Sequence, residues 1–399
     1  MNILMLSDVY FPRVNGVSTS IATFRRSLAE LGHSVCLIAP DYGDRGGEDT
    51  DIFRTPARRV FLDPEDRMMA AGAILALEDT LRARSFDLLH IQTPFIAHRA
   101  GKALAARLKL PVVETYHTYF EEYLYHYVPF LPGSLMKAAA RHFTREQCNR
   151  LDAVIVPSRA MHEVLRTYGV ETPVTVIPTG LEPQSYRSYS QQAFRERHGI
   201  AADRPVMVHV GRVAHEKNIP FLLEVLDVVR GTFPVILLVI AGEGPARRSL
   251  RRQVADRGLG GNVLFIDYLP RGPALWECYS GGDVFVFASA TETQGLVLLE
   301  AMALGIPVVS TARMGTKDIL ADGRGALVSD GTLADFADKV CSVLARPELR
   351  RQLAQEAREY AREWSAGKMA QRLAGFYDHV AGGGEPCPVL ETRDGAATG

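Results

Sequence analysis

Hydrophobic residues along the chain gather in short runs that alternate with longer segments of helical spacing. The first run, Asn2–Leu6, is followed by residues 21–31, in which apolar side chains recur every three or four positions. A second apolar run then occupies residues 34–39. Short apolar runs bounded by polar residues are typical of buried parallel strands, and intervening helices indicate βαβ units. The beginning of the chain therefore predicts a Rossmann-like α/β fold.

The same alternation continues and then starts again further along. After a polar, loop-like segment at residues 178–186, a second series of strands and helices opens at residues 206–210. We predict two Rossmann-like domains, residues 1–183 and 184–364, followed by a helix at 365–381. Residues 382–399 contain glycine, proline and few large apolar side chains, which predicts a disordered tail.

Composition narrows the class of protein without identifying it. The 399 residues are 47% hydrophobic and 23% charged, and the net charge of −1 gives no general attraction to nucleic acid. Five cysteines form no CxxC pair, so we expect reduced, mostly buried thiols. No apolar run is long enough to span a bilayer, and the chain opens directly with a strand. These features favour a cytoplasmic protein without a signal peptide.

Residues 283–310 carry the strongest chemical pattern. A buried strand leads into a polar turn that contains Glu292, and the helix that follows carries Glu300. Backbone N–H groups at the start of a helix favour an anion, and here they belong to Gln294, Gly295 and Leu296. Two carboxylates beside an anion site suit a ligand with both hydroxyls and phosphates, such as a nucleotide sugar. An ordinary exposed glutamate pair is the alternative.

A second pattern follows the strand predicted at residues 206–210. Gly211, Arg212 and Lys217 lie in the next loop, where both cations can reach one diphosphate. The guanidinium offers a planar fork and the ammonium a compact charge. Together they would stabilise a departing nucleoside diphosphate without a metal. A generic basic surface loop is the alternative.

Two further candidates lie in the first half of the chain. Gly16 and Val17 follow the first strand, although the dinucleotide fingerprint GxGxxG is absent. His117 lies at the carboxyl end of the strand predicted at 112–115, where open α/β sheets place their ligands. A turn glycine and a buried structural histidine are the alternatives. Residues 49–51 read Asp-Thr-Asp, a possible metal triplet, but no apolar strand leads into them. We interpret them as solvated surface and predict no catalytic metal.

The segment ETQGLVLLEAMALGIPVV, together with the GR-x4-K pattern at 211–217, resembles the motifs of family 4 retaining glycosyltransferases of the GT-B fold. The resemblance covers nearly the whole chain except the tail. It implies two facing Rossmann-like domains with parallel sheets and a central cleft. It also implies that the helix at 365–381 crosses back to the first domain, the acceptor-binding one.

The resemblance assigns roles to the candidate residues. It implies that Glu292 contacts the donor sugar, that Glu300 holds the ribose and that the backbone near Gly16 lies against the diphosphate. It places His117 near the reacting carbon of the donor sugar. The implied reaction is metal-independent hexosyl transfer with retention by front-face attack, in which the nucleotide sugar is a substrate and no cofactor is required.

The segment 116–145 is distinctive. Seven aromatic residues crowd positions 116–130, and Lys137, Arg141 and Arg145 follow at every fourth position on one face of a predicted helix. Aromatic residues beside a basic helix face suit an anionic membrane surface, and a core-packed helix with a solvated charged face is the alternative. The segment also resembles the acceptor region of bacterial diacylglycerol glucosyltransferases. That resemblance implies UDP-glucose as donor and a lipid acceptor, with residues 119–150 on the inner face of the cell membrane.

Other functions remain open at this point. GDP-mannose with a phosphoinositide or soluble sugar acceptor is the second choice of substrates. A nucleotide-sugar epimerase of the same fold, and a binding scaffold without activity, are different classes of protein. The acceptor, the oligomeric state and the pathway do not follow from the sequence.

Overall fold

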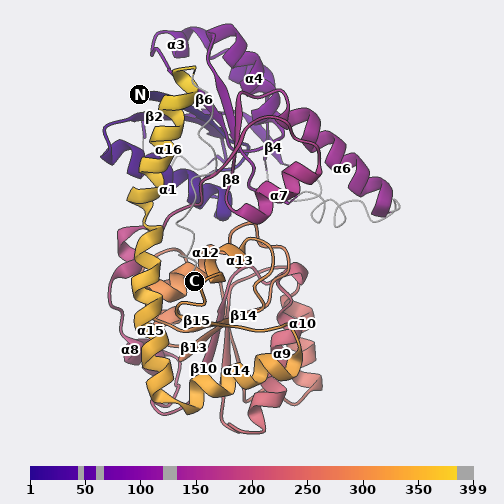
Figure 1. The fold of residues 1–399 in the computed structure, drawn as a ribbon, viewed down its shortest axis with the longest axis vertical. Coiled ribbons are helices and arrows are strands. Elements are labelled where there is room, and N and C mark those ends of the chain that lie inside the picture. The colour runs from indigo at the N-terminus through magenta and orange to yellow at the C-terminus, as the bar shows by residue number, and fades with distance from the viewer. Residues whose placement is uncertain (44–48, 60–66, 120–132, 384–399) are drawn as a thin grey trace, which may run out of the picture. The chain divides into compact units, whose positions relative to one another are not determined.

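The computed structural model of the chain describes residues 1–43, 49–59, 67–119 and 133–383 (Figure 1). The chain divides into two compact units, Met1–Gly180 with Ala366–Gly399, and Leu181–Ser365. We call these the first unit and the second unit. Each contains a parallel sheet with helices on its faces, which confirms the predicted pair of Rossmann-like α/β domains.

The first unit is built on a parallel sheet with the strand order β3-β2-β1-β6-β7-β8-β9. The order reverses between β1 and β6, so the loops after these two strands flank the point where open α/β sheets bind ligands. A short antiparallel pair joins β4 to β5. The strands are β1 (Asn2–Leu6), β2 (Ser34–Pro40), β3 (Ile52–Thr55), β4 (Ala57–Arg59), β5 (Arg67–Met69), β6 (Leu88–Ile91), β7 (Val112–Thr115), β8 (Ala153–Val156) and β9 (Val174–Val176).

Helices cover both faces of this sheet because side chains along a strand alternate between its faces. Ile3 and Met5 of β1 share a core with α1 (Gly16–Glu30) and α16 (Ala366–Ala381), which lie side by side (Figure 1). Leu6, which points to the opposite face, lies beside Gly101 of α4. The remaining helices of the described ranges are α2 (Ala71–Leu75), α3 (Glu78–Arg82), α4 (Ile96–Leu108), α6 (Gly133–Cys148) and α7 (Arg159–Thr167).

One helix prediction in the first unit is wrong. Residues 74–83 read from the sequence alone as one helix, but the structure has α2 and α3 separated by a turn. The Leu77 N–H bonds to the carbonyl of Ile74, three residues back, which interrupts the four-residue ladder of an α-helix. Apolar spacing predicts the helical character here but not this break.

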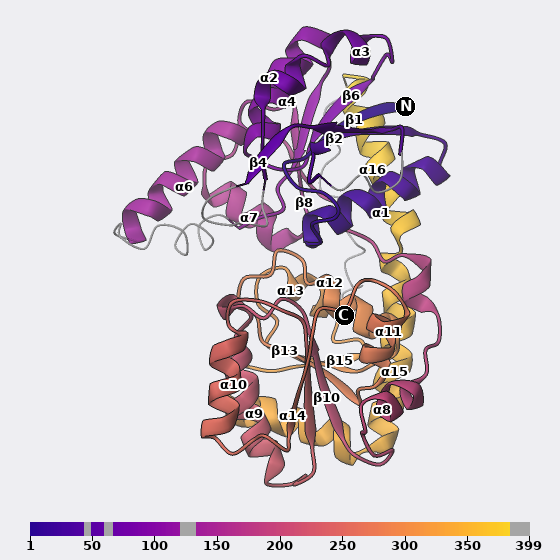
Figure 2. The same cartoon turned by 180° about the vertical axis from the view of Figure 1, so that it is seen from behind.

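The second unit repeats the architecture of a sheet between helices (Figure 2). Its parallel strand order is β12-β11-β10-β13-β14-β15. Here the order reverses between β10 and β13. The loops after these two strands carry the two strongest sequence patterns, Arg212 with Lys217 and Glu292 with Gln294. The strands are β10 (Val206–Val210), β11 (Leu237–Ala241), β12 (Val263–Ile266), β13 (Val284–Phe287), β14 (Val308–Ser310) and β15 (Ala326–Val328).

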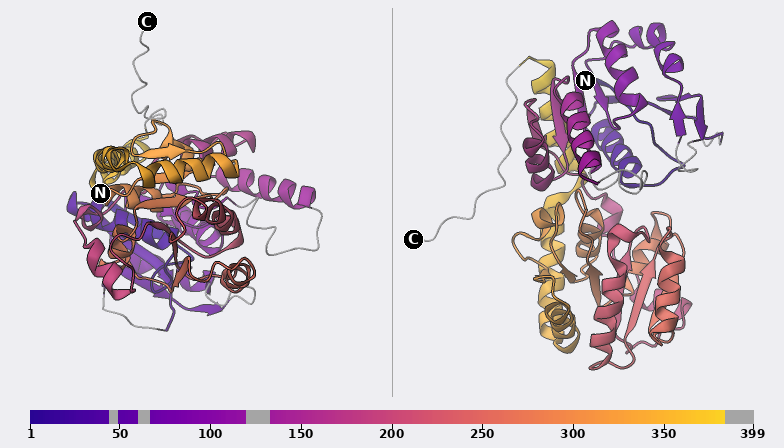
Figure 3. Two further views of the ribbon diagram at one scale, coloured as in Figure 1. Left: turned by 90° about the horizontal axis from the view of Figure 1, so that it is seen from below. Right: turned by 90° about the vertical axis from the view of Figure 1, so that its right-hand side faces the viewer.

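Two helical layers enclose this second sheet (Figures 2 and 3). One apolar core joins the sheet to α8 (Gln191–Arg197), α11 (Pro273–Ser280), α12 (Leu296–Ala303), α13 (Thr316–Leu320) and α15 (Pro347–Ala361). The other joins it to α9 (Ile219–Arg230), α10 (Arg247–Asp256) and α14 (Leu333–Ala345). Three single 3-10 turns complete the unit: η1 (Pro183–Tyr186), η2 (His215–Lys217) and η3 (Arg362–Trp364). Burying both faces of the sheet explains why its strands are continuous apolar runs.

The cysteines in the described ranges are free thiols, as predicted. Cys36, Cys148 and Cys278 are buried and Cys341 is partly buried, while Cys387 lies outside the described residues. Burial raises the pKa of the Cys36 thiol to about 11, so it stays protonated. The expected tail at 382–399 also lies almost entirely outside the described residues. Among the helices that are described, none has the length and apolar character needed to cross a bilayer.

Candidate active site

The loops on either side of the second unit's switch point are joined by an ion pair. Lys217, at the end of η2, places its Nζ against the Oε1 atom of Glu292, which is 75 residues further along the chain. Both side chains are about one-fifth exposed, so a ligand can reach them. The ammonium has three N–H donors, and this contact uses one of them. The structure therefore brings together two of the residues predicted from separate motifs.

Arg212 lies in the same loop and differs from Lys217 in its surroundings. Its side chain is exposed and forms no hydrogen bond or ion pair with the described residues. Because the guanidinium is a planar fork that suits phosphate oxygens, it can bind an anion without first losing another partner.

The start of α12 offers backbone donors close to Glu292. Gly295 precedes the helix with φ 93°, and no side chain caps it. The first two N–H groups of the helix, those of Leu296 and Val297, are therefore available to an anion, whereas the Leu298 N–H bonds to the Gly295 carbonyl at 3.0 Å. A Cβ at position 295 would lie 2.7 Å from the Thr316 side chain, so both the backbone angle and the space require glycine. Gln294, the residue before it, is buried.

The cation-bearing loop after β10 is braced by a second glycine-rich loop. The Gly211 N–H bonds to the Ala241 carbonyl at 3.1 Å, and the Val213 N–H bonds to the Glu243 carbonyl at 2.8 Å. A Cβ on Gly242 would lie 2.0 Å from the Gly211 carbonyl oxygen, which no rearrangement of a side chain can relieve. Backbone contacts thus fix the loop from which Arg212 and Lys217 extend.

Glu300 lies on α12 with partners that the sequence did not indicate. Its Oε2 accepts a hydrogen bond of 2.6 Å from the Tyr279 hydroxyl, and Arg271 Nη1 lies 2.6 Å from its Oε1. The glutamate side chain is 3% exposed. Burial raises the pKa of Tyr279 well above its usual value, and the Glu300 carboxylate adds to this effect. The tyrosine therefore remains a proton donor to the glutamate.

A buried histidine lies on β10, ahead of the cationic loop. His209 Nδ1 lies 3.1 Å from the Val286 carbonyl, and its ring is stacked with Phe287. Burial lowers the pKa of His209 to about 4, so the neutral ring donates its Nδ1 proton to the carbonyl. Sequence reasoning did not single out this residue, because a histidine within an apolar run has no local chemical signal.

Strained backbone occurs in the loop after β14, next to the Glu292 loop. Ala312 and Met314 have φ values of 45° and 50°, in the left-handed region that ordinary residues avoid. The Gly315 N–H bonds to the Glu292 carbonyl at 2.8 Å. Strained positions of this kind cluster at ligand sites, which supports this part of the second unit as functional. The sequence had no signal for them, since neither residue is a typical left-handed residue.

In the first unit, Gly16 and Val17 form the first turn of α1. The Asn15 side chain caps this helix by accepting the Ser18 N–H at 2.9 Å. Open space lies above Gly16, because an added Cβ would meet no atom within 4 Å. The position after β1, at the switch point, is the one predicted from the sequence.

His117 lies beyond the end of β7, and its Nε2 atom is 3.0 Å from Gln92 Oε1. Gln92 follows β6, so the structure places His117 beside the switch point of the sheet. Burial lowers the pKa of His117 to about 4. The ring is therefore neutral at pH 7 and donates its Nε2 proton to the amide oxygen, which leaves Nδ1 as an acceptor.

Two other buried groups support this edge. Asp8 accepts the Thr93 hydroxyl at 2.8 Å and the Ala97 N–H at the start of α4, and burial raises its pKa to about 6. His90 lies between the hydroxyls of Tyr377 in α16 and Thr115 in β7. Burial lowers the pKa of His90 to about 3, so this link is uncharged.

The Asp-Thr-Asp triplet at 49–51 is occupied by ion pairs. Asp49 lies 3.2 Å from Arg25, and Asp51 lies 3.1 Å from Arg84. Both aspartates are exposed, and β3 begins directly after them. Within the described part of the chain, no group of three or more His, Cys, Asp or Glu side chains is arranged to hold a metal ion.

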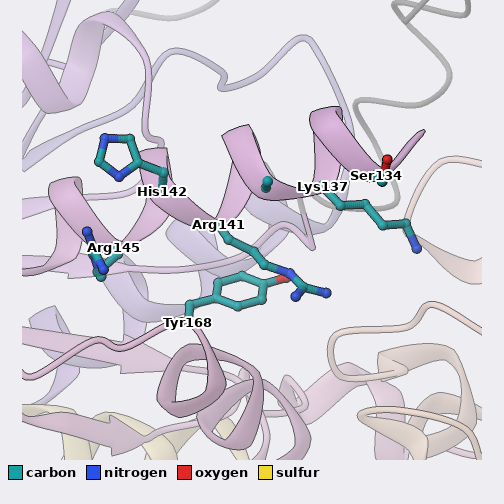
Figure 4. Close-up of a pocket in the computed structure, with 7 residues that line it drawn as sticks. Ser134, Lys137, Arg141, His142, Arg145 and Tyr168 are labelled. Atoms are coloured by element: carbon teal, nitrogen blue, oxygen red, sulfur yellow. The ribbon is translucent and has the colours of Figure 1, made fainter. Parts of the chain in front are cut away.

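The basic row of α6 lines a pocket on the first unit (Figure 4). Lys137, Arg141 and Arg145 are exposed along the helix, as their four-residue spacing predicted. The Arg141 guanidinium lies over the Tyr168 ring, 5.6 Å from its centroid. The other residues of the pocket are Ser134, Ala138 and His142. The aromatic positions between 120 and 130 lie outside the described residues.

Comparisons with known proteins agree with the fold and with the family resemblance of the sequence motifs. Residues 190–360 match the family described as "Glycosyl transferases group 1", and residues 14–185 match "Glycosyltransferase Family 4". The chain is 31% identical to an alpha-monoglucosyldiacylglycerol synthase of Streptococcus pneumoniae, over 94% of this chain and 85% of the relative. It is 26% identical to a GDP-mannose-dependent alpha-mannosyltransferase of Mycobacterium tuberculosis, over 96% of this chain and 97% of the relative.

Among solved structures, Anabaena HepE in complex with UDP-glucose shares the fold. The TM-score is 0.73 at 17% identity, and the match covers 94% of this chain and 98% of that one. The loop that carries Glu292, the first glutamate of the Glu292–Glu300 pair, and the loop that carries the GR-x4-K pattern meet at one switch point. Both halves of the chain match a glycosyltransferase family. The 31% identical relative matches nearly the whole chain. The chain belongs to the group 1, family 4 glycosyltransferases of the GT-B fold.

Proposed function

We propose that the protein transfers glucose from UDP-glucose, with retention, to a lipid acceptor such as diacylglycerol at a membrane surface. The observation that carries the proposal is the Lys217–Glu292 pair at the switch point of the second unit. It is supported by the similarity to an alpha-monoglucosyldiacylglycerol synthase along 94% of the chain.

The second unit would bind the donor. In this proposal Arg212 and Lys217 hold the diphosphate and stabilise the negative charge that develops as it leaves. The backbone of Gln294, Gly295 and Leu296 adds uncharged donors. Glu292 orients sugar hydroxyls, and its contact with Lys217 couples the sugar to the diphosphate. Glu300 binds the ribose.

The first unit would act through uncharged groups. His117 is neutral at pH 7 and is held by Gln92, so it can exchange hydrogen bonds with a sugar hydroxyl without adding charge. Gly16 and Val17 would present the backbone at the start of α1 to the donor phosphates. These roles rest on the family resemblance together with the position of each residue at the carboxyl ends of the strands.

A donor and acceptor screen with product mass spectrometry tests the proposal. The protein is incubated with UDP-glucose or GDP-mannose, and with diacylglycerol vesicles, phosphatidylinositol vesicles or soluble sugars. We expect a glucosylated diacylglycerol from UDP-glucose, with the alpha anomer identified by NMR. Product only with soluble acceptors would contradict the lipid acceptor, and a beta anomer would contradict retention.

Metal independence is tested in the same assay. Because two cations of the chain would neutralise the diphosphate, we expect full activity in excess EDTA. Activity that requires an added divalent cation would contradict the roles given to Arg212 and Lys217.

GDP-mannose is the second candidate donor because a GDP-mannose-dependent relative matches 96% of this chain. Mannosylated product from GDP-mannose, without glucosylated product from UDP-glucose, would select it. Release of free epimerised sugar in the absence of any acceptor would instead indicate an epimerase of the same fold.

We further propose that the α6 pocket contacts anionic lipid headgroups. Lys137, Arg141 and Arg145 supply the charges, and each cation near an anionic surface contributes about 1 kcal/mol of binding. Replacing all three with Gln should weaken sedimentation with phosphatidylglycerol vesicles but not with phosphatidylcholine vesicles.

A matched control removes the same charge elsewhere. Arg248, Arg251 and Arg252 are exposed on α10 of the second unit, and changing these three to Gln should leave vesicle binding intact. Equal loss of vesicle binding in both triple variants would mean that the net charge of the protein, and not the α6 pocket, causes the binding. No loss of vesicle binding in either variant would contradict the proposal.

A further inference from the structure

Glu300 has two partners that differ in how firmly the fold holds them. Tyr279 belongs to α11, is completely buried and stacks on Trp276. Arg271 lies outside the regular elements, in the loop between β12 and α11, and its side chain is 24% exposed. The tyrosine is therefore fixed by core packing, whereas the arginine has room to move.

The two oxygens of Glu300 are also satisfied differently. Oε2 accepts the Tyr279 hydroxyl at 2.6 Å. Oε1 lies 2.6 Å from Arg271 Nη1 as an ion pair, but it accepts no hydrogen bond of good geometry from the described residues. A buried acceptor without a well-aligned donor is uncommon, so Oε1 has capacity for a further donor.

Arg271 lies on the more exposed side of Glu300, so its movement would open the carboxylate to a ligand. The glutamate side chain is 3% exposed, and Arg271 is its more exposed partner. Burial by itself would lower the pKa of Arg271, but the carboxylates of Glu300 and Glu182 outweigh it and raise the pKa. The guanidinium thus stays charged and neutralises a carboxylate that would otherwise be buried and unpaired, which is costly.

We propose that Arg271 covers Glu300 in the donor-free protein and is displaced by a vicinal diol, the ribose of the nucleotide, while Tyr279 holds the carboxylate in position. This inference rests on the proposed donor site and adds to it a covering residue and a positioning residue. The two oxygens of Glu300 each retain acceptor capacity, which matches two adjacent hydroxyls. Arg271 also lies 5.3 Å from the Trp276 ring centroid, a surface on which a displaced guanidinium can remain.

Calorimetric binding of nucleoside diphosphates tests the inference without any acceptor. UDP and GDP are each compared with their 2′,3′-dideoxy analogues on the wild-type protein. A bond between a hydroxyl and a charged group is strong, so we expect the wild type to prefer the ribonucleotide by about tenfold or more. In Tyr279→Phe this preference should fall toward one, with little change in the affinity for the dideoxy analogue.

Tyr360→Phe is a matched control for Tyr279→Phe. Tyr360 is also buried in the second unit, and its hydroxyl lies 3.5 Å from the Asp318 carbonyl rather than at Glu300. This variant should keep the wild-type preference for the ribonucleotide. An unchanged preference in Tyr279→Phe would overturn the positioning role.

Arg271→Gln tests displacement and does not alter a core residue. If the diol displaces Arg271, the variant should bind the ribonucleotide as tightly as the wild type or more tightly. Without donor, the melting temperature of Arg271→Gln should be lower than that of the wild type. Adding the ribonucleotide should raise the melting temperature of the variant by more than it raises that of the wild type. Weaker ribonucleotide binding by Arg271→Gln would show a permanent contact and overturn the inference. A wild type that binds no nucleoside diphosphate would overturn this inference and the proposed donor site together.

Discussion

The two units share a parallel sheet with a switch point, but the groups at those points differ in charge. In the second unit, Lys217 pairs with Glu292 and Arg271 with Glu300, and Arg212 adds an exposed cation. In the first unit His90 and His117 are uncharged at pH 7, whereas Asp8, with a pKa of about 6, is still mostly ionised at that pH. Burial lowers the pKa of His90 to about 3 and of His117 to about 4, and raises the pKa of Asp8 to about 6.

The same sheet architecture can therefore carry two kinds of ligand surface, one charged and one mostly neutral. Fixed opposite charges suit a ligand that carries phosphates and hydroxyls, because each charge has its own target. Neutral hydrogen-bonding groups suit sugar hydroxyls or an uncharged acceptor, since they add no charge that the ligand must neutralise. The sheet order determines where the site lies, and the loops determine what it binds.

The largest expected effect concerns the buried groups themselves. His90, His117 and His209 have pKa values below the usual value for histidine, so at pH 5 the unfolded chain binds three more protons at these sites. Asp8 has a raised pKa and binds one more proton in the folded state, which leaves a net difference of two. The free energy of unfolding should therefore fall by up to about 3 kcal/mol per pH unit as the pH drops through 5.

Urea unfolding between pH 7 and pH 4.5 measures this slope. In the His90→Asn variant one fewer proton is taken up on unfolding. Its free energy of unfolding should therefore change less steeply with pH, by about 1.4 kcal/mol per pH unit. The Asp8→Asn variant should have a steeper one by the same amount, because it removes the opposing group. A stability that does not change between pH 6.5 and pH 5 would contradict the uncharged character of these histidines.

The next effect concerns the charged pair of the second unit. Removing a preorganised group that stabilises developing charge costs about 10²–10³-fold in rate, so we expect Lys217→Met to lower kcat/KM by that factor. Lys339→Met is the matched control, because Lys339 forms an ion pair of similar exposure with Asp335 on α14. Equal activity of the two variants in a glucosyl transfer assay would mean that the Lys217–Glu292 pair is structural.

Arg212 should have a smaller and more selective effect. Since its guanidinium is exposed and unpaired within the described chain, Arg212→Ala should leave stability unchanged. A charge-assisted bond to a phosphate contributes about 1.5–3 kcal/mol, so UDP should bind at least about tenfold more weakly. Uridine, which lacks the phosphates, should bind to Arg212→Ala as tightly as to the wild type in a calorimetric titration. Equal loss for uridine and UDP would place Arg212 elsewhere than at the diphosphate.

The smallest effect is on the shape of the pH profile. Because burial lowers the pKa of His117 to about 4, this residue should not titrate in the range where activity is measured. His117→Gln should lower kcat and yet leave the profile of kcat/KM between pH 5.5 and pH 8 unchanged in shape. The loss of an ionisation near pH 6.5 in the variant would show that His117 titrates and would weaken the contrast between the units.

The sequence predicted the fold and the loops of the site because these follow from local patterns. Apolar period and length predict strands such as β10 and β13, and the residues after them then lie at one edge of the sheet. Arg212, Lys217 and Glu292 were found in this way. The roles assigned to them remain predictions.

Partners across the fold could not be predicted, because they depend on tertiary packing and not on spacing. Tyr279 is 21 residues before Glu300, and nothing in the intervening sequence indicates their hydrogen bond. The ion pair between Arg271 and Glu300 could not be predicted for the same reason. The same holds for the buried Nε2 atom of His209, which has no hydrogen-bond partner among the described residues. The Asp-Thr-Asp triplet is a further example, since its ion pairs with Arg25 and Arg84 depend on residues far from it in sequence.

A crystal structure with UDP bound in the absence of divalent metal would show whether the charges of the second unit hold the leaving diphosphate. We expect Arg212 and Lys217 both to lie within hydrogen-bonding distance of phosphate oxygens, with Glu300 on the ribose. A complex in which both cations point away from the phosphates would contradict this expectation.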